Sequence, residues 1–200
     1  YSLTYNVSDS SNNAATTVTR TVNVVDTGIP SIALIGNNPI LHELQTAFTD
    51  PGATASDASD GDLTSSIVAT GTVDINTAGT YVRSYNVTDS QSNPATTVTR
   101  NVIVADRTAP VITITGSTTV NVEQGSTYTD AGASATDAID GDVSASIVVG
   151  GSVNANVGGT YLLSYNVSDA VGNAATQVTR TVVVSDTTLP VITLIGADPL

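Results

Sequence analysis

The 200-residue chain contains no cysteine, methionine, tryptophan or lysine, and these absences exclude several kinds of chemistry. Without cysteine there can be no disulfides, thiolate metal sites or cysteine nucleophiles. Without lysine, isopeptide cross-links between lysine and asparagine side chains cannot form. A single histidine, His42, cannot supply a recurring Ser–His–Asp arrangement, and no phosphate-binding loop is present. We therefore expect that this segment is not an enzyme.

Positive charge is also scarce, because five arginines face 18 acidic residues and the net charge is −13. A surface with this much negative charge repels nucleic acid and anionic lipid and attracts cations. No run approaches the roughly 20 apolar residues that a membrane-spanning helix needs. The composition therefore predicts neither a nucleic-acid partner nor a membrane span in this segment.

What the chain does contain is an 80-residue repeat. Residues 21–100 align without a gap onto 101–180, with 37 of 80 positions identical. The flanking residues continue the same frame, so we expect the segment to belong to a longer array. The predicted domains are the last strands of a truncated repeat, two whole repeats, and the first strand of another: 1–26, 27–106, 107–186 and 187–200.

Alternating apolar and polar residues, rich in β-branched side chains, predict strands rather than helices throughout the repeat. In the second whole repeat the two strongest strands are 160–168 and 175–186. About seven short strands in 80 residues, separated by Gly, Asn, Asp and Pro, are typical of an antiparallel β-sandwich. The five weaker strands are predicted at 111–115, 119–123, 126–130, 144–149 and 151–155.

The core of this sandwich is predicted from the inward positions of the two strongest strands. Arg180 falls on the same face as the valines of its strand, as do Arg20 and Arg100 in the other repeats. This predicts either a bulge or a carboxylate partner for the arginine. The apolar side chains expected inside are Tyr161, Leu163, Tyr165, Val167, Val178, Val182 and Val184.

The repeat resembles the bacterial immunoglobulin-like repeats of an insecticidal crystal protein and of many large surface proteins, near the hyalin repeats. The resemblance covers the whole chain and rests on D-x-x-x-P-x-I, T-D-x-G-A-x-A-x-D, D-G-D, G-T-Y-x-x-x-Y-N-V-x-D and V-T-R-x-V-x-V. It implies an all-β fold of tandem immunoglobulin-like sandwiches, with a tyrosine corner at 79–81 and 159–161. It also implies a bacterial protein that is extracellular or attached to the cell surface.

Acidic residues are crowded into DASDGDL (57–63) and DAIDGDV (137–143). In an immunoglobulin-like domain these loops share one pole with the entry linker and the loop between the last two strands. Carboxylates about 4 Å apart repel by ~1 kcal/mol in water and ~4 kcal/mol at an effective dielectric near 20. We expect a calcium ion to relieve this repulsion at each junction. The predicted ligands are Asp26, Asp57, Asp60, Asp62 and Asp89, and Asp106, Asp137, Asp140, Asp142 and Asp169.

Two alternatives to calcium stay open: the aspartates could serve only as turn residues, or another cation could bind. The spacing is not that of an EF-hand, because position twelve counted from Asp57 is Val68. Glu43 and Glu123 are expected at the opposite pole, facing the next linker, where they could complete a site. Asp50 and Asp130 are weaker ligand candidates.

The leading functional hypothesis is mechanical: tandem sandwiches form a surface stalk or fibre whose joints calcium stiffens. The partners would be neighbouring repeats of the same chain and, in a fibre, identical chains. The alternative is a module of a surface adhesin or secreted enzyme that binds a glycan or a protein on a host or cell surface. Few aromatic residues are available for glycan stacking, since the chain has seven Tyr and one Phe.

Overall fold

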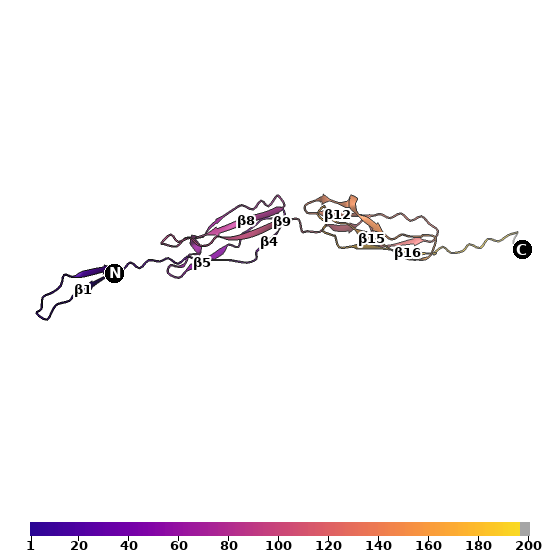
Figure 1. The fold of residues 1–200 in the computed structure, drawn as a ribbon. Coiled ribbons are helices and arrows are strands. Elements are labelled where there is room, and N and C mark those ends of the chain that lie inside the picture. The colour runs from indigo at the N-terminus through magenta and orange to yellow at the C-terminus, as the bar shows by residue number, and fades with distance from the viewer. Residues whose placement is uncertain (197–200) are drawn as a thin grey trace. The chain divides into compact units, whose positions relative to one another are not determined.

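The computed structural model describes residues 1–196, in which each whole repeat forms a two-layered β-sandwich (Figure 1). Contacts between residues divide the chain into two compact units. The first comprises Tyr1–His42, Ala47–Asp74 and Gly79–Val104, and the second comprises Glu43–Thr46, Ile75–Ala78 and the chain from Ala105 onward. No helix in the described residues is long and apolar enough to cross a membrane.

Each whole repeat contains seven strands, as the sequence predicts. In both repeats the last two strands are the longest and pair with each other in the four-stranded sheet. The first repeat contains β3 (Ser31–Leu34), β4 (Ile40–Glu43), β5 (Ala53–Asp57), β6 (Gly61–Asp62), β7 (Val68–Thr70), β8 (Gly79–Asn86) and β9 (Val98–Ala105). The second contains β10 (Val111–Ile114), β11 (Thr119–Glu123), β12 (Ala133–Asp137), β13 (Gly141–Asp142), β14 (Val148–Gly150), β15 (Gly159–Asn166) and β16 (Val178–Ser185).

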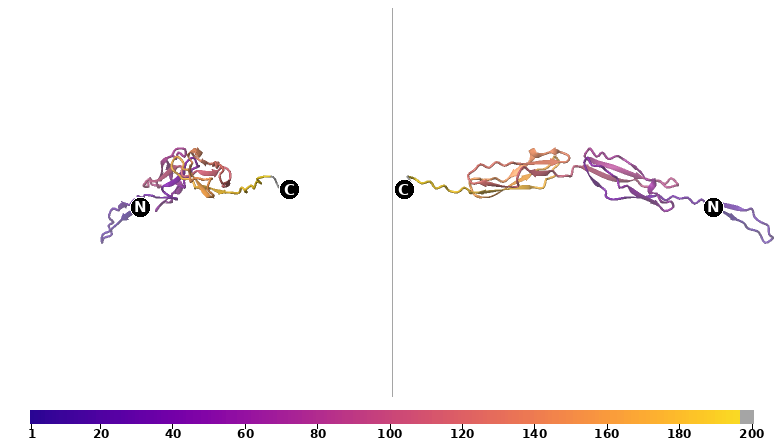
Figure 2. Two further views of the ribbon diagram at one scale, coloured as in Figure 1. Left: turned by 90° about the vertical axis from the view of Figure 1, so that its right-hand side faces the viewer. Right: turned by 180° about the vertical axis from the view of Figure 1, so that it is seen from behind.

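The sheets have the same strand order in both repeats, β3-β5-β6 with β4-β9-β8-β7, and β10-β12-β13 with β11-β16-β15-β14. Figure 2 shows the same strands from two further sides. Pairing in the second repeat is antiparallel except where β11 runs parallel to β16. The first two strands of the repeat thus belong to different sheets, so the chain crosses between the layers within residues 115–118.

The described residues before the whole repeats form strands, whereas those after them do not. A hairpin of β1 (Ser2–Tyr5) and β2 (Val18–Thr21) corresponds to the last two strands of a repeat. The strand predicted in 187–200 is not formed in residues 187–196, and the remaining four residues lie outside the described part of the chain. Its counterpart β10 is a strand because it pairs with β12, and residues 187–196 have no such partner among the described residues.

Two of the weaker strand predictions are wrong in the second repeat, and a third is only partly right. Residues 126–130 are not a strand, and the third strand is β12, which begins after Gly132 with its φ of +75°. Residues 144–149 divide into a 3-10 helix, η2 (Ser144–Ser146), and the short β14, while 151–155 form no strand. In the first repeat the equivalent 3-10 helix is η1 (Thr64–Ser66). Pairing with β10 outweighs the low strand propensity of the sequence ASATD in β12.

The predicted core is confirmed. Leu163, Tyr165, Val167, Val182 and Val184 are buried, while Tyr161 and Val178 pack against them partly buried. The predicted tyrosine corner is also present, because the Tyr161 hydroxyl donates a hydrogen bond of 2.8 Å to the carbonyl of Val157.

Arg180 lies inside this core and has a carboxylate partner, as predicted. Its guanidinium forms an ion pair with Asp130 and donates to the carbonyls of Thr115, Gly132 and Ser117. The Tyr165 hydroxyl donates to both oxygens of Asp130 at 2.8 Å, and the Arg180 guanidinium lies 5.8 Å from the centre of the Tyr165 ring. The arginine thus joins residues of both sheets without leaving its charge unpaired.

Candidate metal site

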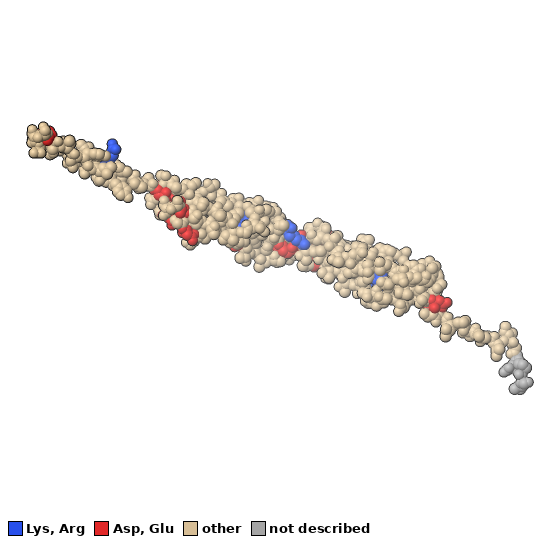
Figure 3. Space-filling model, turned by 90° about the horizontal axis from the view of Figure 1, so that it is seen from below, with Lys and Arg blue, Asp and Glu red and all other residues tan. Residues whose placement is uncertain are grey.

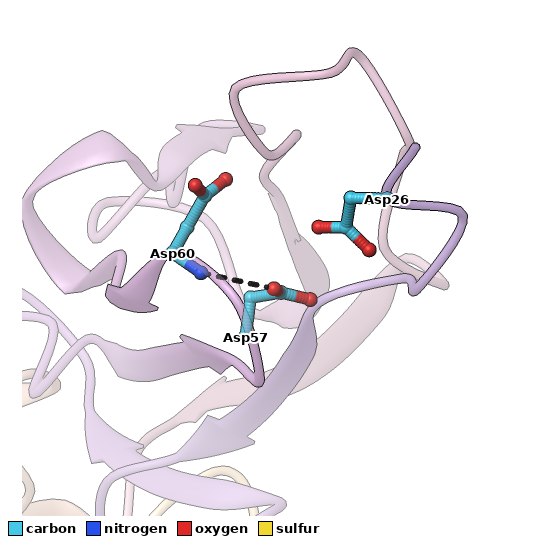
Figure 4. Close-up of side chains that lie close together, drawn as sticks. All are labelled: Asp26, Asp57 and Asp60. Atoms are coloured by element: carbon cyan, nitrogen blue, oxygen red, sulfur yellow. Dashed lines mark hydrogen bonds between the residues drawn. The ribbon is translucent and has the colours of Figure 1, made fainter. Parts of the chain in front are cut away.

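Each whole repeat brings three carboxylates together near its entry linker. In the second repeat they are Asp106 of the linker, Asp137 at the end of β12, and Asp140 in the turn to β13. In the first repeat they are Asp26, Asp57 and Asp60 (Figure 4). One carboxylate oxygen from each member lies within 4.8 Å of one from every other member. Figure 3 shows acidic side chains gathered at the ends of the sandwiches, while the sheet surfaces between them are largely uncharged.

The turn between β12 and β13 uses one oxygen of Asp137 and leaves the other free. Asp137 Oδ1 accepts the backbone N–H groups of Ile139 at 2.8 Å and Asp140 at 3.0 Å. Gly141 pairs with Asp137 across the hairpin and has a φ of +72°, which favours glycine there. Asp137 is 9% exposed, and its Oδ2 atom is buried without a hydrogen-bond partner among the described residues. A buried carboxylate oxygen without a partner is costly unless a ligand satisfies it.

The first repeat has the same turn. Asp57 Oδ1 accepts the N–H of Ser59 at 2.7 Å and that of Asp60 at 3.2 Å, the bond drawn in Figure 4. Asp26 Oδ1 accepts the N–H of Gly28 at 2.8 Å, and the carboxylate is directed toward Asp57 in the same view. Here the buried oxygen without a partner is Asp26 Oδ2. Each cluster therefore contains one such oxygen.

The third carboxylate differs between the two clusters. Both oxygens of Asp60 are engaged by Ser90, whose N–H donates at 2.7 Å and whose hydroxyl donates at 2.9 Å. At the equivalent place Asp140 Oδ2 accepts the N–H of Ala170 at 2.7 Å. Alanine has no hydroxyl, so Asp140 Oδ1 accepts no hydrogen bond from the described part of the chain. The second cluster therefore presents one more carboxylate oxygen to a ligand.

The pKa of Asp106 reflects its position among other carboxylates. Burial raises its pKa, and the charges of Asp137, Asp169 and Glu43 raise it further, although the N–H of Thr108 acts in the opposite direction. The pKa therefore lies above its ordinary value. A carboxylate held among like charges is a ligand whose ionised form a divalent cation would stabilise.

Two predicted ligands, Asp89 and Asp169, lie outside the three-membered clusters. Asp169 Oδ1 accepts three backbone N–H groups of the β15–β16 loop, and its Oδ2 accepts the side-chain amide of Asn173. Asp89 is held in the same way by Gln91 and Asn93. Burial acts to raise the pKa of each, but the asparagine and loop hydrogen bonds outweigh it and lower the pKa. Both residues serve as turn residues, which was the alternative interpretation of their sequence.

Asp62 and Asp142 also lie outside the clusters. Each is exposed and accepts the N–H of the first residue of a 3-10 helix, Thr64 or Ser144, at 2.9 Å. Hydrogen bonds from the side-chain hydroxyl of that residue, and then from its backbone N–H, lower the pKa of both carboxyls. The structure thus brings together six of the ten predicted ligands.

Asp50 and Asp130, the weaker candidates, belong to the core network of their repeats. Asp50 forms ion pairs with Arg100 at 2.6 Å and Arg83 at 3.1 Å, and accepts the Tyr85 hydroxyl. Burial acts to raise the pKa of both aspartates, but the tyrosine hydroxyl and the arginine lower it below the ordinary value. The arginine at a core position of the last strand was the signal that could have predicted this pairing.

Glu43 and Glu123 bind backbone N–H groups of the linker that follows their repeat. Glu123 accepts the N–H groups and hydroxyls of Thr187 and Thr188. These side-chain and backbone hydrogen bonds lower the Glu123 pKa to about 2. The two oxygens of Glu43 accept the N–H of Arg107 at 3.2 and 3.1 Å. Each glutamate therefore holds the first residues after a linker aspartate.

The strand order and core define the class of protein: a pair of immunoglobulin-like β-sandwiches. Residues 32–104 and 112–184 match the family described as "Bacterial surface protein, Ig-like domain". The chain belongs to this family, which confirms the resemblance of its sequence motifs. It is therefore an immunoglobulin-like segment of the bacterial surface-protein type.

Individual relatives resemble parts of the chain. An uncharacterised 81.3 kDa protein of Acholeplasma phage L2 is 36% identical over an alignment of 119 residues that covers 57% of this chain and 16% of that protein. The solved structure of the M60 catalytic domain with the CBM51-1 and CBM51-2 domains from Clostridium perfringens ZmpB has a TM-score of 0.51 at 12% identity. That match covers 92% of this chain and 33% of the other, and supports the fold alone.

Proposed function

We propose that the chain is a structural segment of an extracellular surface stalk, in which each repeat binds one calcium ion near its entry linker. The observation that carries this proposal is the cluster of Asp106, Asp137 and Asp140, in which Asp137 Oδ2 is buried without a partner. The same arrangement recurs 80 residues earlier with Asp26, Asp57 and Asp60. Recurrence in both whole repeats favours a role in the array rather than in one specialised domain.

Calcium suits these clusters better than other common metals. The ligands are hard carboxylate oxygens, with no cysteine in the chain and no histidine in the clusters, which disfavours zinc and copper. Calcium accepts 6–8 oxygens in irregular geometry, whereas magnesium requires a tight octahedron. Because one ligand of each cluster comes from the linker and two from the β-hairpin turn, a bound ion would fasten the linker to the sandwich.

The proposal is tested by thermal melting and small-angle X-ray scattering of the chelator-treated chain with and without added calcium. We expect calcium to raise the melting temperature and to narrow the distribution of interatomic distances, because the linker gains a fixed attachment. Magnesium at the same concentration serves as the control and should have a smaller effect. Identical melts and scattering profiles with calcium and with chelator would rule out the metal-dependent stiffening.

A second candidate function, the binding of a glycan or protein, is favoured by a groove in the first repeat. It lies beside β4 and includes His42 and Phe48, whose rings meet edge to face at 5.1 Å, together with Leu41, Pro39 and Pro51. Binding of the chain to a glycan array, lost in a Phe48→Ala variant, would support this function. If the chain binds no glycan on the array, glycan binding is ruled out and only protein binding is left for this groove.

A further inference from the structure

Glu43 belongs to the first repeat but lies beside the linker that carries Asp106 of the second aspartate cluster. Residues Glu43–Thr46 and Ile75–Ala78 belong to the second compact unit, with the chain from Ala105 onward. The Leu44 N–H donates to the carbonyl of Ala105 at 3.0 Å, and the Gln45 N–H donates to that of Ile75 at 2.8 Å. Glu43 is thus held beside the linker by the backbone of its own segment.

From this place the Glu43 carboxylate acts on the linker in two ways. Both of its oxygens accept the N–H of Arg107, the residue that directly follows Asp106. Its negative charge also acts on the Asp106 carboxylate. The hydrogen bonds restrict the backbone that carries Asp106, and the charge increases the negative potential there.

We propose that Glu43 is a positioning residue for the second cation site, so that the preceding repeat completes the calcium site of the repeat that follows. This inference rests on the proposed calcium binding and deepens it. It gives the array a polarity, because each repeat would strengthen the site after it and not its own. The first cluster has no equivalent of Glu43 within the 200 residues, since the matching position would lie 80 residues earlier.

The test measures calcium affinity one site at a time by isothermal titration calorimetry of the full chain. Asp57→Asn removes the first site and leaves the second, and Asp137→Asn does the reverse. In the Asp57→Asn background, Glu43→Ala should weaken calcium binding about tenfold, the lower end of the effect of removing a residue that orients a metal ligand. Glu43→Gln keeps a hydrogen-bond acceptor but not the charge, and should weaken binding by a smaller factor.

Two controls separate this effect from a general loss of structure. Glu123→Ala removes the equivalent glutamate, whose linker leads to the next repeat, and should leave the second site unchanged. Glu43→Ala in the Asp137→Asn background should leave the first site unchanged. If Glu43→Ala alters second-site affinity by less than twofold while the wild type binds calcium, Glu43 has no positioning role. If the wild-type chain binds no calcium, both the proposed function and this inference are overturned.

Discussion

The two whole repeats share their fold, but the buried arginine–aspartate pair has different hydrogen-bond partners in each. In the second repeat Arg180 Nε donates a hydrogen bond to the carbonyl of Ser117, and the Tyr128 hydroxyl donates one to Asp130 at 3.2 Å. In the first repeat the Nε atom of Arg100 is buried and has no hydrogen-bond partner in the described part of the chain, and a second arginine, Arg83, also pairs with Asp50. Leu163 and Phe48 stand where the other repeat has Arg83 and Tyr128.

This difference shows how a buried ion pair tolerates sequence change in a repeat protein. The carboxylate needs donors on both oxygens, and either an arginine from the neighbouring strand or a tyrosine can supply the additional one. The ion pair itself, between the arginine of the last strand and an aspartate two residues before a glycine, is present in both repeats. In a domain without disulfides or tryptophan it links the two sheets.

The largest expected effect is the loss of that arginine. Arg180→Met should destabilise the second repeat by about 3–5 kcal/mol, because Asp130 and several carbonyls lose their donor. Arg100→Met should cost less by about 0.2–1 kcal/mol, since the partly exposed Arg83 still pairs with Asp50. Hydrogen exchange resolved by repeat would measure both. Equal losses in the two repeats would mean that Arg83 is no substitute for Arg100.

Acid should destabilise both repeats by a smaller amount. The pKa of Asp50 and that of Asp130 are lowered on folding, because hydrogen bonds and arginine charges outweigh burial. Their stabilisation is therefore fully present above the unfolded pKa near 4 and is lost as pH falls through the lower folded pKa. Melting temperatures measured from pH 6 to pH 2 should fall below pH 4. In Asp130→Asn the second repeat should show a weaker dependence.

The smallest expected effect concerns the third carboxylate of each cluster. Ser90→Ala frees Asp60 Oδ1 and should tighten calcium binding at the first site by about twofold to tenfold, the equivalent of ~0.5–1.5 kcal/mol for one hydrogen bond. Ala170→Ser supplies the missing hydroxyl to Asp140 and should weaken the second site by a similar factor. Titration calorimetry of the single-site variants measures both, and changes in the same direction would refute the comparison.

Much of the fold was predictable from the sequence because the repeat displays its pattern twice. Alternation in the long strands predicts β15, β16 and their inward residues, and the arginine on that face predicts a carboxylate partner. The third strand was misplaced because ASATD has little strand character and becomes a strand only through pairing with β10. Long-range pairing of this kind leaves no local signal.

The sequence predicted which aspartates lie near the candidate site, but not which of them have a carboxylate oxygen available to a ligand. Spacing and fold place the linker and turn aspartates at one pole, but the sequence does not decide which of them face a ligand and which only stabilise a turn. The separation depends on hydrogen bonds within the loops: Asn173 and the loop amides engage both oxygens of Asp169, whereas Asp137 Oδ2 is left without a partner. The role of Glu43 in holding the Arg107 amide likewise depends on a contact between residues 64 positions apart.

The most direct test of calcium binding is the stoichiometry measured by titration calorimetry for the wild type and for the Asp57→Asn and Asp137→Asn variants. With one cluster in each whole repeat, the wild-type chain should bind two calcium ions, and each variant should bind one. Asp89→Asn and Asp169→Asn serve as matched controls and should retain two ions, because those carboxylates are occupied by their own loops. No binding by the wild type, or two ions bound by both cluster variants, would contradict the account.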